Sequence, residues 1–254
     1  MEVLKINDLS IHFGGLKAVS DFNITINKNE IVGLIGPNGA GKTTIFNLIT
    51  GVYKPTNGKI FFCYDDITNV DQMHICRKGI ARTFQNIRLF YNMSVIDNVM
   101  VGMSSLKENH CSIPSSIFRT KRHFNSERDM REEAKKLLKV FNLLEERNEV
   151  SSSLPYGKQR KLEIARALAT RPTLLLLDEP AAGMNEEETK ELMETIKSIR
   201  DAFDLTILII EHDMKLISNI CDKVTVLNFG QVLASGTAKE VLNNSEVIKA
   251  YLGD

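Results

Sequence analysis

One eight-residue segment constrains this chain more than any other. Residues 36–43 read Gly-Pro-Asn-Gly-Ala-Gly-Lys-Thr and fit the phosphate-binding pattern G-x-x-x-x-G-K-[ST] at every fixed position. The apolar run Ile31–Ile35 precedes this loop and predicts a buried strand, while residues 44–50 predict a helix that ends at Gly51. Strand, glycine-rich loop and helix in this order are the context in which the pattern binds a nucleoside triphosphate.

The residue types in the loop suit a polyphosphate. Glycines let successive backbone N–H groups turn inward as an anion-binding nest, and the nest opens on the positive end of the helix. Lys42 offers a cation to the β- and γ-phosphates, and Thr43 offers a hydroxyl to Mg²⁺. We expect these residues to contact the nucleotide: Gly36, Pro37, Asn38, Gly39, Ala40, Gly41, Lys42, Thr43 and Thr44.

Composition argues against several other classes of protein. Lys plus Arg and Asp plus Glu both total 32, so the net charge is zero, whereas nucleic-acid binders usually show a basic excess. The four cysteines are scattered without C-x-x-C spacing, so we expect reduced thiols rather than a zinc site or a disulfide framework. The N-terminus has no signal-peptide pattern, and no apolar run approaches the ~20 residues that span a bilayer. We expect no nucleic-acid partner and no transmembrane segment.

The order of patterns along the chain predicts an α/β fold. Period-two apolar runs in residues 4–26 predict antiparallel strands, and residues 56–59 predict a turn before a strand at 60–62. Residues 87–150 are helical in character, although the stretch 104–126 has no clear period and predicts a loop or short helix. From Lys158 onward helices and strands alternate, which implies a largely parallel sheet.

A pair of acids follows the strongest apolar strand of the second half. The apolar run 174–177 is followed by Asp178 and Glu179, at the carboxyl edge of the sheet where ligands of open α/β folds bind. Asp178 can enter the Mg²⁺ shell, and Glu179 can act as general base on the attacking water. His212 ends the next predicted strand, where an imidazole can reach phosphate and water. Gln85 lies just before the helical region 87–150 and has no evident role when taken alone.

Taken together, these segments resemble the ATP-binding subunits of ABC transporters over essentially the whole chain. Residues 36–43 resemble Walker A and Leu174–Asp178 resembles Walker B, with Glu179 as catalytic glutamate. Gln85 matches the Q-loop, which implies a contact with Mg²⁺, and His212 matches the switch histidine. The resemblance also implies further contacts with ATP, made by an adenine-stacking ring and a signature segment: Phe13, Leu154, Pro155, Tyr156, Gly157, Lys158 and Gln159.

The resemblance implies a single ABC ATPase domain over residues 1–254. Residues 1–86 and 158–235 would form a P-loop NTPase core, a RecA-like parallel sheet flanked by helices, with an N-terminal antiparallel β-subdomain. Residues 87–157 would form the inserted helical subdomain, and residues 236–254 a C-terminal helical tail.

The same resemblance implies a mechanism and partners. Two such subunits enclose two ATP molecules, each held by the Walker motifs of one subunit and the signature helix of the other, and ATP hydrolysis drives transmembrane transport. Residues 81–90, 163–168, 181–185, 211–214 and 250–253 resemble the branched-chain amino-acid importers most closely. That branch implies a different second ATPase, two polytopic membrane subunits and, indirectly, an extracytoplasmic solute-binding protein. It places the chain at the cytoplasmic face of the cell membrane.

The signature segment departs from the family pattern Leu-Ser-Gly-Gly-Gln. Pro155 replaces the serine, Tyr156 a glycine and Lys158 the glutamine. Either these changes are neutral, or this chain supports hydrolysis at the partner's ATP poorly and the two sites are unequal. Asn185 stands where the family has an aspartate, and Ala182 where it has a serine. The sequence does not decide whether this loop still transmits changes between the two subunits.

Other readings remain open. Phe90, Tyr91 and Met93 line a groove for a membrane-subunit helix or pack within the helical region. An ATPase of lipid or lipopolysaccharide export has a similar tail and is the second transport function. A soluble ABC protein would usually carry tandem ATPase domains or long coiled coils, which this sequence lacks. A phosphoryl-transfer kinase would need no signature segment.

Overall fold

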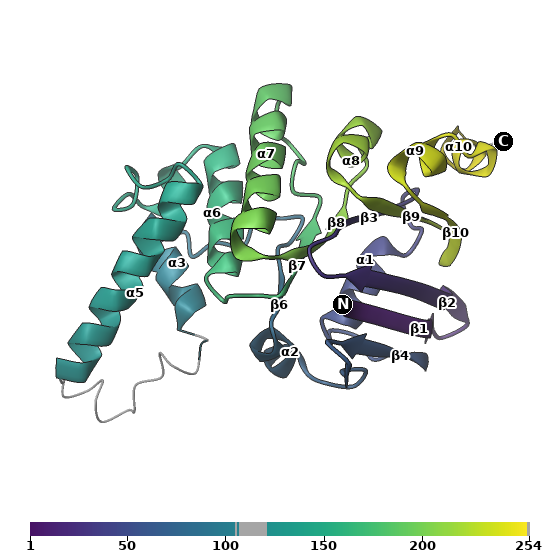
Figure 1. Cartoon of the computed structure of the whole chain (residues 1–254), viewed down its shortest axis with the longest axis horizontal. Coiled ribbons are helices and arrows are strands. Elements are labelled where there is room, and N and C mark those ends of the chain that lie inside the picture. The colour runs from purple at the N-terminus through teal and green to yellow at the C-terminus, as the bar shows by residue number, and fades with distance from the viewer. Residues whose placement is uncertain (105, 107–120, 253–254) are drawn as a thin grey trace.

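Two β-sheets with helices between and around them form the molecule (Figure 1). The structure is a computed structural model that describes residues 1–104, 106 and 121–252, without the side chains of residues 121–126 and 252. Most of the predicted loop or short helix at 104–126 therefore lies outside the described residues, with Cys111 in it, and so does Gly253 of the importer-like ending. Residues 121–126 are the start of a long helix.

The smaller sheet is antiparallel and confirms the strands predicted before the phosphate loop. Its strand order is β2-β1-β4-β5. The bounds are Glu2–Phe13 for β1, Leu16–Asn27 for β2, Asn57–Phe62 for β4 and Asp65–Asp66 for β5. The predicted turn at residues 56–59 is wrong, because Gly58 lies inside β4 with φ of 88°. Here β4 crosses a bulge of β1 so closely that a Cβ on Gly58 would lie 2.4 Å from the Asp8 carbonyl oxygen.

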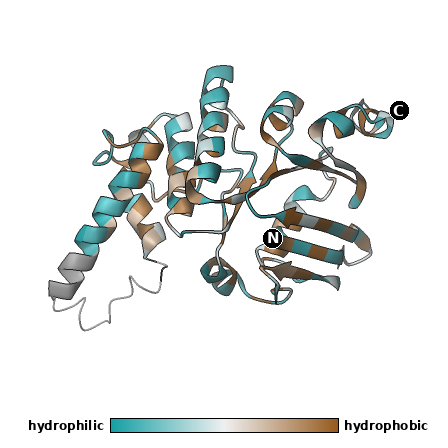
Figure 2. Cartoon of the chain, viewed as in Figure 1, coloured by the Kyte–Doolittle hydropathy of each residue, from teal (hydrophilic) through white to brown (hydrophobic). Residues whose placement is uncertain are grey.

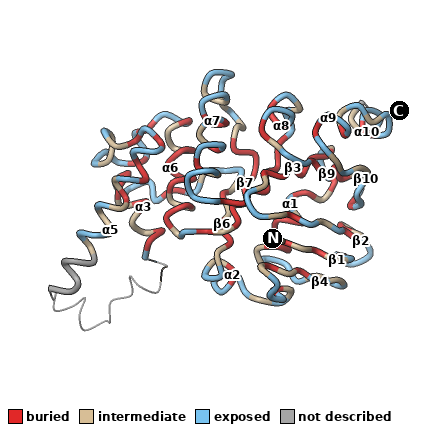
Figure 3. Tube along the Cα trace, in the orientation of Figure 1, coloured by how far each residue is buried: buried red, intermediate tan, exposed pale blue. Residues whose placement is uncertain are grey.

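The larger sheet contains the strands that precede the phosphate loop and the two acids. Its strand order is β10-β9-β3-β8-β7-β6, with β3 between β8 and β9 and all neighbours parallel except β10. The bounds are Ile31–Ile35 for β3, Ile80–Arg82 for β6, Leu174–Asp178 for β7, Thr206–Ile210 for β8, Lys223–Asn228 for β9 and Gln231–Gly236 for β10. Every residue of β3, β7 and β8 is buried, as expected of a parallel sheet covered on both faces (Figure 3).

Two apolar cores fill the two sides of this sheet. Alternate residues divide between them, so that Ile31 and Ile35 of β3 join one core while Val32 and Leu34 join the other. The second core also contains apolar side chains of β1, β2 and β4 and of helix α1 (Lys42–Ile49). Helix α1 therefore lies between the two sheets (Figures 1 and 2).

The remaining helices cover the first core and the ends of the molecule, except α2, whose Ile75 joins the second core. Helices α3, α5 and α6 pack together at one end of the molecule, and α7, α8 and α9 follow over the larger sheet (Figure 1). The bounds are Gln72–Lys78 for α2, Val95–Met103 for α3, Lys121–Val140 for α5, Tyr156–Leu168 for α6, Glu186–Phe203 for α7, Met214–Ile220 for α8, Ala238–Leu242 for α9 and Ser245–Leu252 for α10. Helix α6 begins two residues before the expected Lys158, directly after Pro155 at its N-cap. The observed architecture confirms the predicted fold class, and the division at residues 87, 157 and 236 stays a prediction.

Candidate nucleotide site

The phosphate loop joins β3 to α1 at the carboxyl edge of the larger sheet. Gly36 has φ of 150°, and a Cβ there would lie 2.1 Å from the Leu227 carbonyl oxygen, so only glycine fits. Lys42 is buried, and its Nζ donates to the carbonyl oxygens of Gly36 (2.6 Å) and Pro37 (2.9 Å). Burial lowers the pKa of Lys42, while Glu179 and Asp178 partly oppose the shift. The loop thus carries a partly desolvated cation at its centre.

Asp178 lies at the end of β7 in a buried ion pair that the sequence did not reveal. Its Oδ2 accepts from Nη2 of Arg82 at 2.7 Å, and both side chains are less than a tenth exposed. Arg82 also donates to Oδ1 of Asn47 at 2.7 Å and lies over the rings of Phe46 and Phe84. Arg82 ends β6 beside β7, which is the only feature that could have pointed to it. This ion pair fixes the Asp178 carboxylate through one of its two oxygens.

Glu179 contacts two residues that are far from it in the sequence, Gln85 and His212. Its Oε2 accepts from Nε2 of Gln85, and its Oε1 contacts Nε2 of His212, both at 2.7 Å. The backbone of Glu179 has φ of 48°, in the left-handed region, and its N–H donates to the Ile210 carbonyl oxygen. Its side chain is 12% exposed, so the carboxylate has limited access to solvent. A carboxylate held in this way can accept a proton from one ordered water.

A cavity of about 690 Å³ lies beside this cluster and is lined by residues 38–44 of the phosphate loop region, Gln85, Glu179 and Phe229, but not by His212. Thr43, Gln85 and Asp178 would supply hydroxyl, amide and carboxylate oxygens, the donor types that Mg²⁺ prefers. The ion pair with Arg82 engages Oδ2 of Asp178, and Gln85 uses its amide nitrogen on Glu179. The donor set therefore fits Mg²⁺. Within the described ranges no group of three His, Cys, Asp or Glu could hold a metal by itself.

Phe13, the expected adenine-stacking residue, ends β1 beside the cavity rather than in its lining. Its ring is 44% exposed and packs edge-on against Tyr53, with centroids 5.2 Å apart. Leu16 and Lys17 at the start of the paired strand line the cavity instead.

The signature segment lies apart from this cluster, at the N-terminal end of α6. Leu154 is buried, and its carbonyl oxygen accepts from Nε2 of Gln159 at 2.8 Å. Pro155 is the N-cap and makes no side-chain capping bond. Tyr156 is 44% exposed, and Lys158 forms an ion pair with Glu146. The N-terminal end of α6 is therefore exposed at Pro155 and Tyr156.

Gly157 has close neighbours in the next helix. A Cβ on Gly157 would lie 2.9 Å from Oε1 of Glu188, in the first turn of α7. Asn185 caps α7 in a capping box: its Oδ1 accepts the Glu188 N–H at 2.9 Å, and Oε2 of Glu188 accepts the Asn185 N–H at 3.1 Å. The starts of α6 and α7 are thus packed side by side.

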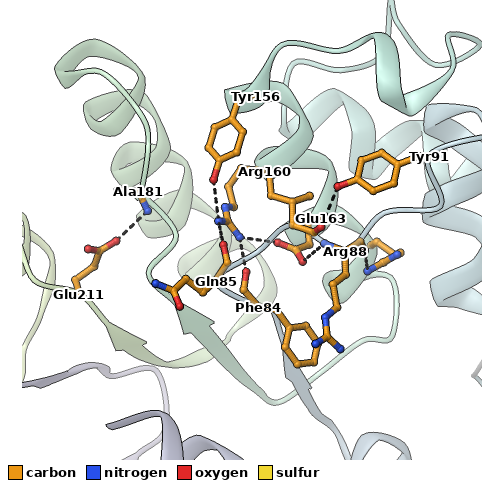
Figure 4. A network of polar contacts seen from close by, with 11 residues as sticks. Phe84, Gln85, Arg88, Tyr91, Tyr156, Arg160, Glu163, Ala181 and Glu211 are labelled. Carbon is orange, nitrogen blue, oxygen red and sulfur yellow. Dashed lines mark hydrogen bonds and ion pairs between the residues drawn. The ribbon is translucent and has the colours of Figure 1, made fainter. Parts of the chain in front are cut away.

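Glu211 is a buried carboxylate to which the sequence gave no role. It is 4% exposed, and it accepts the N–H of Ala181 at 2.9 Å and the N–H of His212 at 3.3 Å. Burial raises the pKa of Glu211, and the two backbone donors oppose that shift. Its position beside His212 was the only available signal. Glu211 ties the loop after β7 to the loop after β8 (Figure 4).

A separate groove of about 480 Å³ lies between α2, α3, α6 and the segment after β6. Phe90 lines this groove and is 47% exposed, with the Arg166 guanidinium 5.4 Å from its ring centroid. Tyr91 and Met93 are also exposed but lie outside the lining, and the Tyr91 hydroxyl donates to the Ile87 carbonyl oxygen. Of the three candidates, Phe90 is the residue the structure places in the groove.

No helix in the described part of the chain is long and apolar enough to cross a membrane.

Comparison with known proteins identifies the family. The family model described as ABC transporter matches residues 19–182, and the model described as branched-chain amino acid ATP-binding cassette transporter matches residues 231–254. The chain is 44% identical over 252 residues to the high-affinity branched-chain amino acid transport ATP-binding protein BraF of Pseudomonas aeruginosa, covering 99% of this chain and 98% of BraF. It is 45% identical to LivG of Escherichia coli K12 with the same coverage.

A more distant relative and a solved structure are also ATP-binding proteins of transport systems. The lipopolysaccharide export protein LptB of Haemophilus influenzae is 32% identical, over 100% of this chain and 98% of LptB. The ADP conformation of MJ1267, an ATP-binding cassette of an ABC transporter, superposes with a TM-score of 0.86 at 31% identity, covering all of both chains. The chain belongs to the ATP-binding proteins of ABC transporters, in the branched-chain amino-acid branch.

Proposed function

We propose that this chain is the ATP-hydrolysing subunit of an ABC importer for branched-chain amino acids, converting ATP and water to ADP and phosphate. The observation that carries this proposal is the Glu179 carboxylate held between Gln85 and His212 beside the phosphate loop. This arrangement suits a general base for a water that attacks the γ-phosphate. The branch is supported by the names of the relatives that are 44% and 45% identical.

The residues have distinct roles in this mechanism. Lys42 exchanges its two carbonyl partners for the β- and γ-phosphate oxygens, and the loop N–H groups bind the remaining charge. Thr43, Gln85 and Asp178 hold Mg²⁺, which neutralises charge on the phosphates when it is bound. Glu179 orients and deprotonates water. Gln85 holds Oε2 of its carboxylate, and His212 holds Oε1. Phe13 and Thr44 complete the nucleotide contacts.

The open end of α6 supports a dimer in which ATP is shared. In such a dimer Pro155, Tyr156 and Gly157 face an ATP molecule bound by a second, different ABC ATPase, and positive helix ends attract phosphate. The groove lined by Phe90 suits a cytoplasmic helix of one of two membrane subunits, because it combines an exposed ring with Arg88 and Arg166. The chain then acts at the cytoplasmic face of the membrane and meets the solute-binding protein only indirectly.

The test uses the full complex of this chain with its second ATPase and membrane subunits in nanodiscs. We expect ATP hydrolysis to rise when the binding protein is loaded with leucine, isoleucine or valine, and we expect Glu179→Gln to abolish the increase. Stimulation by other solutes alone would overturn the substrate assignment. Specific binding of lipopolysaccharide components with no response to amino acids would favour the export function instead.

A further inference from the structure

Arg160 of α6 is a fully buried cation outside the cluster around Glu179. Its Nη1 donates to the Phe84 carbonyl oxygen and its Nη2 to the Gln85 carbonyl oxygen, both at 2.6 Å. Nη1 also forms an ion pair with Oε2 of Glu163 at 2.8 Å (Figure 4). One guanidinium therefore holds two consecutive carbonyl groups of the segment that carries Gln85.

The chemistry of this contact explains why arginine stands there. A buried charge is costly unless it is paired and hydrogen-bonded, and Arg160 meets that condition through Glu163 and the two carbonyls. The guanidinium presents its N–H groups in a rigid, planar fork that reaches both carbonyls and Glu163 at once, whereas the lysine ammonium is a compact point charge on a flexible stem. Because the carbonyl positions of Phe84 and Gln85 fix the local backbone, Arg160 determines where the Gln85 amide meets Glu179.

Tyr156 lies one helical turn before Arg160 and touches it. The Tyr156 hydroxyl accepts from Nη2 of Arg160 at 3.4 Å, and the guanidinium lies 6.0 Å from the ring centroid. The ring also packs against the loop after β7, because a Cβ built on Gly183 would lie 3.3 Å from it. Tyr156 is still 44% exposed at the N-terminal end of α6. Its side chain therefore contacts Arg160 and the loop that Glu211 holds, and it also reaches the surface.

We propose that Arg160 is a positioning residue for Gln85, and that Tyr156 makes this position depend on what is bound at the N-terminal end of α6. This inference rests on the proposed function, in which the second subunit's ATP lies at that end. Movement of Tyr156 then reaches Glu179 through Arg160 and Gln85 within a single chain. The tyrosine that replaces a family glycine links the ATP of one site to the hydrolytic residues of the other.

The test isolates this chain's own site. The complex is assembled with a second ATPase whose own hydrolysis has been inactivated, so that all turnover comes from the cluster around Glu179. We expect Arg160→Met to lower kcat about 10-fold or more while the Kd for ATP changes less than about two-fold, because the residue positions a reacting group without touching nucleotide. Arg160→Lys should recover part of the loss, since lysine keeps the charge but lacks the rigid fork that holds the two carbonyls and Glu163 together.

Lys161→Met is the matched control. Lys161 is the next residue of α6, is also buried, and pairs with Glu191 at 2.6 Å rather than with the Gln85 segment. We expect kcat within about two-fold of wild type for this variant. Thermal unfolding of all variants shows which of them fold. If Arg160→Met does not fold, Arg160→Lys and the Tyr156 variants decide.

The Tyr156 variants test the link itself in the same complex. Tyr156→Gly removes the ring and the hydroxyl, and we expect this chain's own kcat to fall about three- to ten-fold; Tyr156→Phe removes only the long hydrogen bond and should lower kcat less. Unchanged kcat in both Tyr156→Gly and Arg160→Lys would overturn the inference. Glu179→Gln is measured in parallel. If Glu179→Gln loses its turnover, the proposed function stands, and an unchanged kcat in the other variants counts against this inference alone. If Glu179→Gln stays active, the proposed function itself fails.

Discussion

The cluster around Glu179 and the open end of α6 are built in opposite ways. In the cluster, side chains from β6, β7 and the loops after β6, β7 and β8 bind one another, so that Asp178 has Arg82 and Glu179 has Gln85 and His212. At the end of α6, Pro155 offers no capping bond and Tyr156 is half exposed. The first region is held together by its own side chains, whereas the second is exposed and, in the proposed dimer, would be covered by the second subunit's ATP. Variants that disturb each region should therefore fail in different ways.

The largest expected effect is on the chemistry of the cluster. Glu179→Gln keeps the shape of the side chain and its contact with Gln85 but removes the base, so we expect kcat to fall about 100- to 10,000-fold with ATP binding retained. Steady-state ATPase assays and equilibrium ATP binding measure the two quantities. The control is Glu187→Gln, an exposed glutamate in the first turn of α7, which should leave both unchanged.

The second prediction concerns the stability of the cluster. Arg82→Met leaves Asp178 buried and charged without its partner, and we expect a loss of about 3–5 kcal/mol in the free energy of unfolding. Urea denaturation monitored by circular dichroism gives this value. Arg82→Met combined with Asp178→Asn should recover most of the stability and none of the activity. A double variant no more stable than Arg82→Met would contradict the pairing.

The third prediction concerns the starts of α6 and α7. Asn185→Ala removes the capping box of α7, so we expect about 1 kcal/mol of destabilisation, while Asn185→Asp should retain the cap. Because the α7 start packs against Gly157, the same variant should also change hydrogen exchange in the first turn of α6. Exchange that changes only in α7 would show that the two helix starts are independent.

The smallest expected effect is a pH dependence from Glu211. Burial raises the pKa of this carboxyl above its ordinary value of 4.5, so the folded chain binds a proton more readily than the unfolded chain. Its contribution to stability is therefore fully present below pH 4.5 and is lost as the pH rises through the raised pKa. Glu211→Gln cannot ionise and should show a smaller fall in Tm between pH 5 and pH 8 than wild type. An equal fall in both proteins would refute the assignment.

The sequence predicted what depends on neighbours in the chain and missed what depends on contacts between distant segments. The phosphate loop, the acids after β7 and the Asn185 cap are all encoded within a few residues. Arg82 meets Asp178 across 96 residues and Arg160 meets Gln85 across 75, so neither pair leaves a local pattern. The wrong turn at residues 56–59 has the same origin, because a Gly58 that reads as a turn residue makes room for the backbone of β1.

Helix α1 has one further consequence, for how the chain can be divided. Ile45, Phe46 and Ile49 are fully buried between the two sheets, in a core to which both sheets contribute. A cut between β2 and the phosphate loop would separate β1 and β2 from this helix and expose the part of its surface that packs against them. The two sheets therefore form one folding unit, and a split version of the protein should reassemble only when cut elsewhere.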